Sequence, residues 1–121
     1  MANHNELGKD GEFFAQQYLE KNGYKIRHVN WRTGKLEIDI VAEKDNLLVI
    51  VEVKTRSTSF WNEPSQAVDA KKIKNLVNAT HYYILENNLN LDVRFDVISL
   101  IPEKESYKIE HIENAFIPPI N

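Results

Sequence analysis

The sequence contains no cysteine. This absence excludes disulfide bridges, thiolate zinc sites, iron–sulfur clusters and cysteine nucleophiles. The four histidines, His4, His28, His81 and His111, are scattered and show no zinc-ligand spacing, so a histidine zinc site is not expected either. A metal ion bound by this chain would therefore be a hard cation held by carboxylates.

Long apolar runs are also missing. The longest, Leu47–Val51, is far shorter than the roughly 20 residues that span a bilayer. The N-terminus is polar and acidic, unlike a signal peptide, so we expect a cytoplasmic protein with no membrane association. The 121 residues, of which 42% are hydrophobic and 27% charged, have the composition of one globular domain covering residues 1–121.

The net charge of −3 does not show the basic excess that is usual in nucleic-acid-binding proteins. The charge is unevenly distributed, however. Residues 21–74 carry eleven basic and seven acidic side chains, whereas residues 1–20 and 75–121 are both acidic. The positive middle segment is compatible with nucleic-acid contact, and equally with an ordinary solvated surface.

Hydrophobic spacing and turn residues predict the element order α-β-β-β-α-β, with one further strand at the end. We expect helices at 6–22 and 69–87, the second capped by Asp69, and strands at 24–29, 36–42, 47–54, 91–101 and 107–112. Residues 30–35 are expected to turn, Pro102 to stop a strand, and residues 114–121 to form a loose tail. This order predicts an α/β fold with a mixed central β-sheet flanked by helices.

Two neighbouring predicted strands carry the residues that are candidates for catalysis or metal binding. Glu37 and Asp39 share one strand face, and Glu52 and Lys54 share a face of the next strand, because residues i and i+2 point the same way. If these strands form a hairpin, the carboxylates and the lysine converge. Glu12 lies on the buried stripe of the first helix, where a carboxylate needs a partner, or on its flank, where the side chain reaches water.

Clustered carboxylates repel one another unless a cation compensates their charge. Mg²⁺ or Mn²⁺ would suit such a cluster, and the neighbouring Lys54 can orient an attacking water or steady a phosphate oxygen, which together make a site for phosphodiester hydrolysis. The simpler alternative is that Glu37 and Asp39 face solvent while Glu52 only pairs with Lys54.

The segments 34–42 (GKLEIDIVA) and 51–56 (VEVKTR) resemble the core of PD-(D/E)XK nucleases, which have a restriction-endonuclease-like fold. More narrowly, nearly the whole chain is similar to the YraN family of small bacterial endonuclease-like proteins. The resemblance implies that Asp39 and Glu52 are metal ligands and that Lys54 is the catalytic lysine. It also implies a metal-site role for Glu12, which resembles a helix-one glutamate of archaeal Holliday-junction resolvases. Glu37 is the alternative residue to complete the metal shell.

Basic residues flank the motif strands and are candidates for contact with phosphates. They are Arg32, Lys35, Arg56, Lys71, Lys72 and Lys74. Phe60 and Trp61 lie in the loop that follows the second motif strand, and they can stack on bases or pack into the core. Arg94 and Asp96 are interpreted as a structural pair.

The sequence thus predicts a Mg²⁺- or Mn²⁺-dependent endonuclease acting on DNA rather than RNA. The alternatives are an inactive nucleic-acid-binding module of the same fold and a protein-interaction domain. A homodimer is expected if the substrate is a four-way junction.

Overall fold

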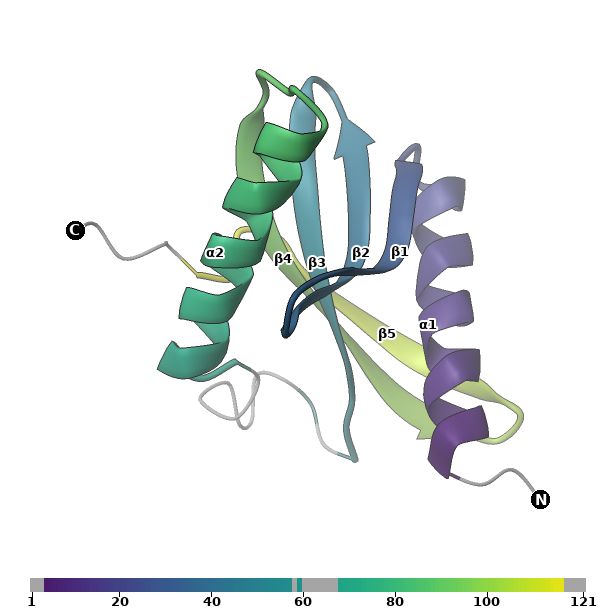
Figure 1. The fold of residues 1–121 in the computed structure, drawn as a ribbon. Helices are drawn as coiled ribbons and strands as arrows, with labels where there is room; N and C mark the ends of the chain where they lie inside the picture. The colour runs from purple at the N-terminus through teal and green to yellow at the C-terminus, as the bar shows by residue number, and fades with distance from the viewer. Residues whose placement is uncertain (1–3, 58, 60–67, 117–121) are drawn as a thin grey trace.

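The computed structural model describes residues 4–57, 59 and 68–116, and from residue 10 onward it also describes the side chains of the first helix. Two helices cover opposite faces of one sheet, so that the domain has three layers (Figure 1). The elements are α1 (His4–Lys21), β1 (Lys25–Thr33), β2 (Leu36–Lys44), β3 (Leu47–Thr55), α2 (Ala70–Glu86), β4 (Asp92–Glu103) and β5 (Ser106–Ile112). Neither described helix has the length and apolar character needed to cross a membrane.

The five strands lie in the order β1-β2-β3-β4-β5. The β3–β4 pair is parallel and the other three pairs are antiparallel. Helix α2 makes the crossover between the parallel strands, which need a long connection. The mixed α/β fold with flanking helices is therefore confirmed, as is the hairpin between β2 and β3.

Alternate residues of β3 fill two separate hydrophobic cores. Val51 packs with Ala15 of α1 on one face of the sheet. Ile50 packs with Tyr83 of α2 on the other face. Glu52 continues the Ile50 side of the strand, so its carboxylate lies on the face that α2 covers.

Several element boundaries differ from the sequence expectation. Strand β1 runs on to Thr33, into the expected turn at 30–35, and the chain turns only at residues 34 and 35. Asn30, inside the strand, adopts a left-handed backbone (φ 52°) and bends the strand without ending it. Strand β4 runs past Pro102, which pairs with Tyr107 of β5. Pairing between β3 and β4 ends at Leu100, so β3 has no residue opposite Pro102. The missing N–H of proline therefore leaves no β3 carbonyl without its donor.

The expected loose tail is wrong for residues 114–116. The backbone N–H of Asn114 donates to Asp96, that of Ala115 donates to the carbonyl of Phe95, and the ring of Phe116 stacks on the ring of Phe95. These contacts hold the segment against β4. Residues 117–121, with their two prolines, lie outside the described residues.

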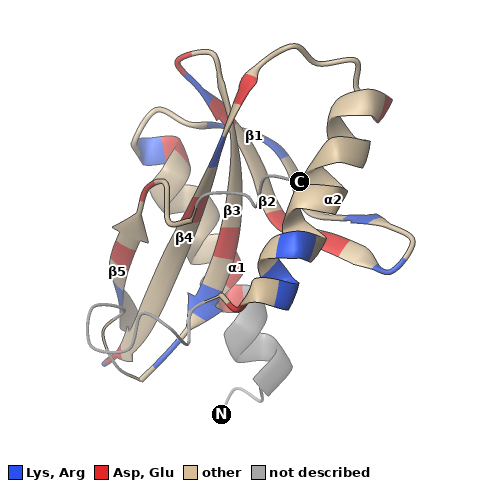
Figure 2. Cartoon of the chain, turned by 90° about the vertical axis from the view of Figure 1, so that its left-hand side faces the viewer, with Lys and Arg blue, Asp and Glu red and all other residues tan. Residues whose placement is uncertain are grey.

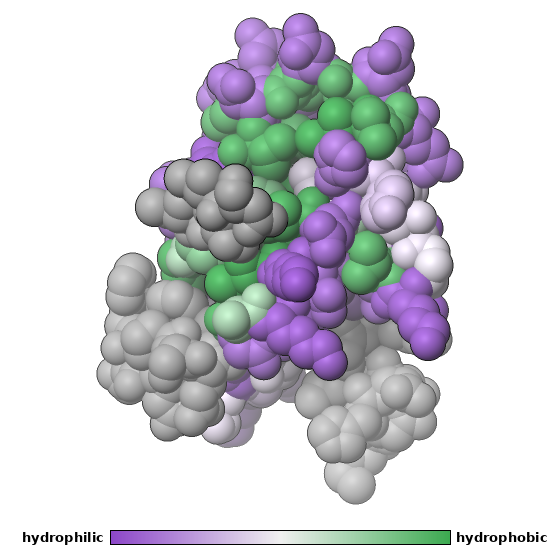
Figure 3. All heavy atoms as spheres, turned by 60° about the vertical axis from the view of Figure 1, so that its left-hand side comes forward, coloured by the Kyte–Doolittle hydropathy of each residue, from purple (hydrophilic) through white to green (hydrophobic). Residues whose placement is uncertain are grey.

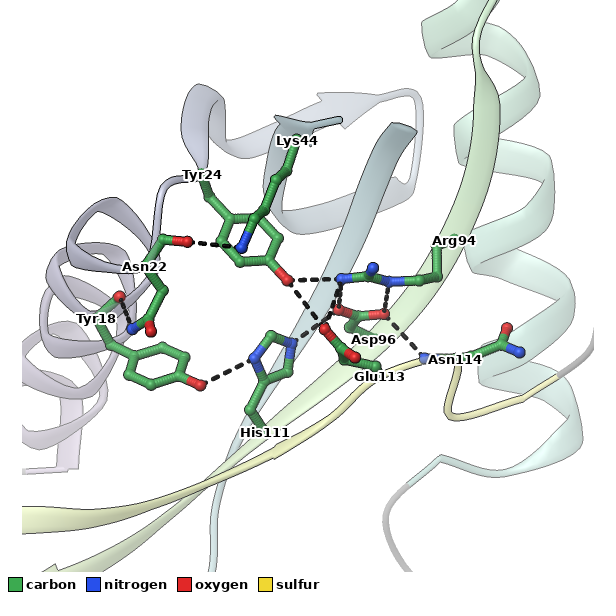
Figure 4. A network of polar contacts seen from close by, with 9 residues as sticks. All are labelled: Tyr18, Asn22, Tyr24, Lys44, Arg94, Asp96, His111, Glu113 and Asn114. Carbon is green, nitrogen blue, oxygen red and sulfur yellow. Dashed lines mark hydrogen bonds and ion pairs between the residues drawn. The ribbon is translucent and has the colours of Figure 1, made fainter. Parts of the chain in front are cut away.

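A buried ion-paired network lies on the α1 side of the sheet (Figure 4). Asp96 is fully buried, and Arg94 donates to both of its oxygens at 2.9 Å. His111 Nε2 lies 2.7 Å from Asp96 Oδ2, and His111 Nδ1 lies 3.0 Å from the Tyr18 hydroxyl of α1. The Arg94–Asp96 contact expected from the sequence is thus present, and His111 extends it to α1.

The network also sets the charge state of its carboxylate. Burial alone would raise the pKa of Asp96, but the hydrogen bonds from His111, Arg94 and the Asn114 backbone outweigh burial and lower it. Asp96 therefore stays ionised, and it joins β4, β5 and α1 away from the carboxylates of β2 and β3.

Candidate active site

The carboxylates Asp39 and Glu52 lie where two paired strands separate. The last residue pair between β2 and β3 is Ile40 with Val51, and beyond it β3 remains paired with β4 only. The free end of the β1–β2 hairpin leaves the plane of the sheet there (Figure 1). Asp39 bridges this split, because its Oδ2 accepts a hydrogen bond from the Val53 backbone N–H at 2.8 Å.

Glu52 is a buried carboxylate, and the two described cations that pair with it both lie against the same oxygen. Its side chain is 3% exposed. Lys54 Nζ and Lys72 Nζ each lie 3.5 Å from Oε2. With both carboxylates ionised, Oε1 is buried and has no hydrogen-bond partner among the described residues. An unpaired buried carboxylate oxygen is unfavourable, so this site favours either a cation or the proton that Asp39 can share with Glu52.

Asp39 is held in a state that resists ionisation. Burial raises the pKa of Asp39 to about 7, and the nearby charge of Glu52 pushes it in the same direction. The Val53 hydrogen bond and the charge of Lys72 oppose these effects without cancelling them. The half-buried carboxyl of Asp39, partly protonated near neutral pH, and the buried carboxyl of Glu52 are in contact and form a pair that can hold a proton or a cation.

These features fit a divalent cation. Carboxylate oxygens are the ligands that Mg²⁺ and Mn²⁺ prefer, and one or two protein carboxylates are sufficient when waters and substrate phosphates supply the rest. The unpartnered Oε1 of Glu52 and the carboxylate of Asp39 are the atoms that would hold the ion.

The structure does not bring Glu37 or Glu12 into this pair. Glu37 Oε1 forms an ion pair with Arg32 at 3.5 Å, and Glu12 Oε2 accepts from Asn30 Nδ2 at 3.0 Å. Among the side chains that the structure describes, no three acidic or histidine residues are grouped to hold a metal ion. Asn30 lies opposite Asp39 in the β1–β2 register, so Glu12 reaches the bend in β1.

The basic residues predicted to contact phosphates fall into two groups beside the pair. Arg32, 71% exposed, and the exposed Lys35 lie at the end of the β1–β2 hairpin, whereas Lys71, Lys72 and Lys74 lie in the first turns of α2. Figure 2 shows blue segments at both places, with red on the strands between them. Figure 3 shows hydrophilic side chains gathered in the middle of this side of the molecule.

Arg56 follows the end of β3, is half-buried, and donates its backbone N–H to the carbonyl of Leu100 at 2.8 Å. Phe60 and Trp61 lie outside the described residues. The structure adds one residue to the site itself, since Lys72, predicted only to touch phosphates, contacts Glu52. Its placement in the first turn of a helix, where the dipole favours acids, was the signal available in the sequence.

A cavity of about 470 Å³ opens elsewhere, between α1 and the β4–β5 hairpin. Phe13, Phe14 and Tyr107 line it together with Asp10 and Glu103. It contains neither Asp39 nor Glu52, so the chemistry of the carboxylate pair and this hollow are separate features.

Comparison with known proteins identifies the family. A "UPF0102 protein" of Bacteroides thetaiotaomicron is 53% identical over 120 residues, covering 99% of both chains. A "UPF0102 protein" of Flavobacterium psychrophilum is 49% identical and covers 96% of this chain and 98% of its own length, and one of Porphyromonas gingivalis is 44% identical over 96% and 87%. Residues 11–100 match the profile of "Uncharacterised protein family UPF0102", a span that includes Asp39, Glu52, Lys54 and Lys72. The chain therefore belongs to the UPF0102 family, which is the YraN family that its motifs resemble.

Proposed function

We propose that this protein is a divalent-cation-dependent nuclease that hydrolyses phosphodiester bonds of DNA at the Asp39–Glu52 pair. The observation that carries the proposal is the buried Glu52 Oε1, which lacks a hydrogen-bond partner among the described residues and lies beside the half-buried carboxyl of Asp39. A purely structural ion pair between Glu52 and its lysines would not account for Asp39 at the same point.

Asp39 and Glu52 would hold the cation. When bound, Mg²⁺ or Mn²⁺ supplies Lewis-acid polarisation of a phosphate oxygen and acidifies a water. Asp39 is fixed for this task by the Val53 N–H, and Glu52 is fixed by its burial in β3. Because both side chains are held by the sheet, little reorganisation is needed when substrate arrives.

Lys54 is the group that acts on the reacting atoms. It lies two residues after Glu52 on the same face of β3, and its side chain is 39% exposed, so its ammonium can face both the carboxylate and an incoming phosphate. There it orients the attacking water and stabilises the negative charge that develops on phosphorus-bound oxygen.

DNA would lie across the two basic groups. Arg32 and Lys35 on the hairpin and Lys71 and Lys74 on α2 are on elements that flank the split between β2 and β3. Contacts with phosphates from such residues give affinity with little sequence preference. The negative net charge of −3 is concentrated in other parts of the sequence.

The test is cleavage of labelled linear, single-stranded, flapped and four-way DNA with Mg²⁺, Mn²⁺ or EDTA. We expect cutting that requires the metal, is lost in Asp39→Asn, and falls by about a hundredfold or more in Lys54→Ala. Lys108→Ala, which removes an exposed lysine of β5, is the matched control and should cut like wild type.

Two results would overturn the proposal. Wild type that binds DNA in a salt-sensitive way yet cuts none of the substrates would be a binding module of this fold. Cutting that survives Asp39→Asn would place the activity outside the Asp39–Glu52 pair.

A further inference from the structure

Two lysines approach one oxygen of Glu52 from different elements. Lys54 shares β3 with Glu52, whereas Lys72 reaches across from the first turn of α2, and both ammonium groups lie 3.5 Å from Oε2. The N-terminal turn of a helix favours acidic side chains, yet α2 has none there. The buried anion of Glu52 explains why a lysine occupies that turn.

The second lysine becomes unfavourable once a divalent cation is present. A cation held by Asp39 and Glu52 would place two positive charges beside Lys54 and Lys72, and like charges at such distances repel. Lys72 is free to respond, because its side chain is 39% exposed and carries its charge on a flexible stem. Lys54 has less freedom to leave, because its backbone is fixed in β3 two residues from Glu52.

Building on the proposed function, we propose that Lys72 is an exchangeable counter-ion of the carboxylate pair. It neutralises Glu52 while no metal is bound, leaves Oε2 when a divalent cation binds, and then contacts a phosphate of the nucleic acid. Cation and nucleic acid therefore strengthen each other's binding, and the coupling is reciprocal. The site loads fully only when both are present.

The first test uses Mn²⁺ alone as the probe, titrated into the full chain without nucleic acid and followed by the electron paramagnetic resonance of free Mn²⁺. Lys72→Met keeps the apolar stem and removes the charge. It should bind Mn²⁺ about five- to tenfold more tightly than wild type. Lys108→Met, which removes an exposed lysine of β5 outside the proposed site, is the matched control and should stay within about twofold of wild type.

A second variant separates charge from shape. Lys72→Gln should also bind Mn²⁺ more tightly than wild type, and both variants should remain folded because Lys54 still pairs with Glu52. Variants that bind Mn²⁺ no better than Lys108→Met would overturn the inference, as would opposite effects of the Met and Gln substitutions at Lys72.

A separate measurement tests the coupling between cation binding and nucleic-acid binding. With Ca²⁺ as an oxygen-preferring cation, a labelled duplex oligonucleotide should bind wild type more tightly than it does in EDTA, and this gain should shrink in Lys72→Met but not in Lys108→Met. An equal gain in all three proteins would overturn the inference.

Failure of the proposed function gives a different pattern. Mn²⁺ binding that is absent, or equally strong in Asp39→Asn, would refute the metal site and this inference with it. Binding that depends on Asp39 and ignores Lys72 would refute only the exchange of Lys72.

Discussion

The Asp39 side chain accepts a hydrogen bond from the Val53 backbone N–H at 2.8 Å, at the point where β2 leaves β3. This side-chain bond takes the place of a backbone hydrogen bond between the two strands. This hydrogen bond holds β2 and β3 together at the point where they separate, and it fixes the position of the Asp39 carboxyl group. Because Val53 has no β2 carbonyl opposite it in the register, the Asp39 oxygen is what keeps its N–H from being unsatisfied.

Asp39→Ala is therefore expected to speed hydrogen exchange of the Val53 amide, whereas Asp39→Asn is expected to preserve its protection. Asparagine retains an acceptor oxygen of similar reach, and alanine leaves the N–H without one. Native-state exchange followed by NMR measures this directly. The Ile50 amide, within the paired part of β3, serves as the internal control and should exchange alike in both variants. Equal protection of Val53 in both variants would contradict the role given to Asp39.

The raised pKa of Asp39 predicts a loss of metal-free stability as pH rises. Between the ordinary pKa of 3.8 and the folded value of about 7, the folded state binds more protons at this site than the unfolded state does. The free energy of unfolding contributed by Asp39 therefore falls with rising pH across that window and is constant above it. Urea unfolding from pH 4 to pH 8 in EDTA measures the effect.

Asp39→Asn is the reference, because it removes the titration and leaves the histidines and Asp96 unchanged. Asp96, with its lowered pKa, is ionised in both states over most of this range and contributes little slope. Wild type should lose stability relative to Asp39→Asn as pH rises, and Mg²⁺ should reduce that loss because metal binding favours the ionised carboxylates. A difference that stays flat with pH would show that Asp39 ionises normally.

The sequence was sufficient to predict which face of the sheet each side chain of β3 points to, but it was not sufficient for all of β2. Period-two alternation holds for β3 up to Lys54, because pairing with β4 continues to Thr55. In β2 the same rule groups Ile38 with Ile40, and the structure instead buries Ile38 in the α2 core. This change of face occurs where β2 leaves β3, opposite Asn30 of β1 with its positive φ.

Contacts between residues far apart in the sequence were the other feature that the local sequence pattern could not predict. Asp69 was predicted as a helix cap, and it accepts from the Lys72 N–H at 2.8 Å. That Lys72 also meets Glu52 depends on how α2 packs on the sheet, which no spacing within residues 69–72 reveals. The same holds for His111, whose contact with Asp96 depends on the register between β4 and β5.

Removal of the Asp96 carboxylate is expected to weaken the fold and leave the proposed metal site intact. Asp96→Ala strips a fully buried anion from Arg94 and His111, and breaking a buried pair costs about 3–5 kcal/mol of unfolding free energy. Asp92→Ala, at an exposed position of the same strand, should change stability by less than about 0.5 kcal/mol. Urea unfolding at pH 7 compares the two, and equal stability of both variants would refute a stabilising network.

Lys35 is expected to contribute one phosphate contact. It is exposed at the turn of the β1–β2 hairpin, so Lys35→Ala should weaken binding to duplex DNA similarly for all sequences. Each lost contact lowers the slope of log affinity against log salt by about one. Lys108→Ala removes the same charge from β5, at the opposite edge of the sheet from β1, and should leave the slope at its wild-type value. Fluorescence anisotropy from 50 to 300 mM salt distinguishes the variants. Equal slopes for both would mean that net charge, and not the hairpin, attracts the DNA.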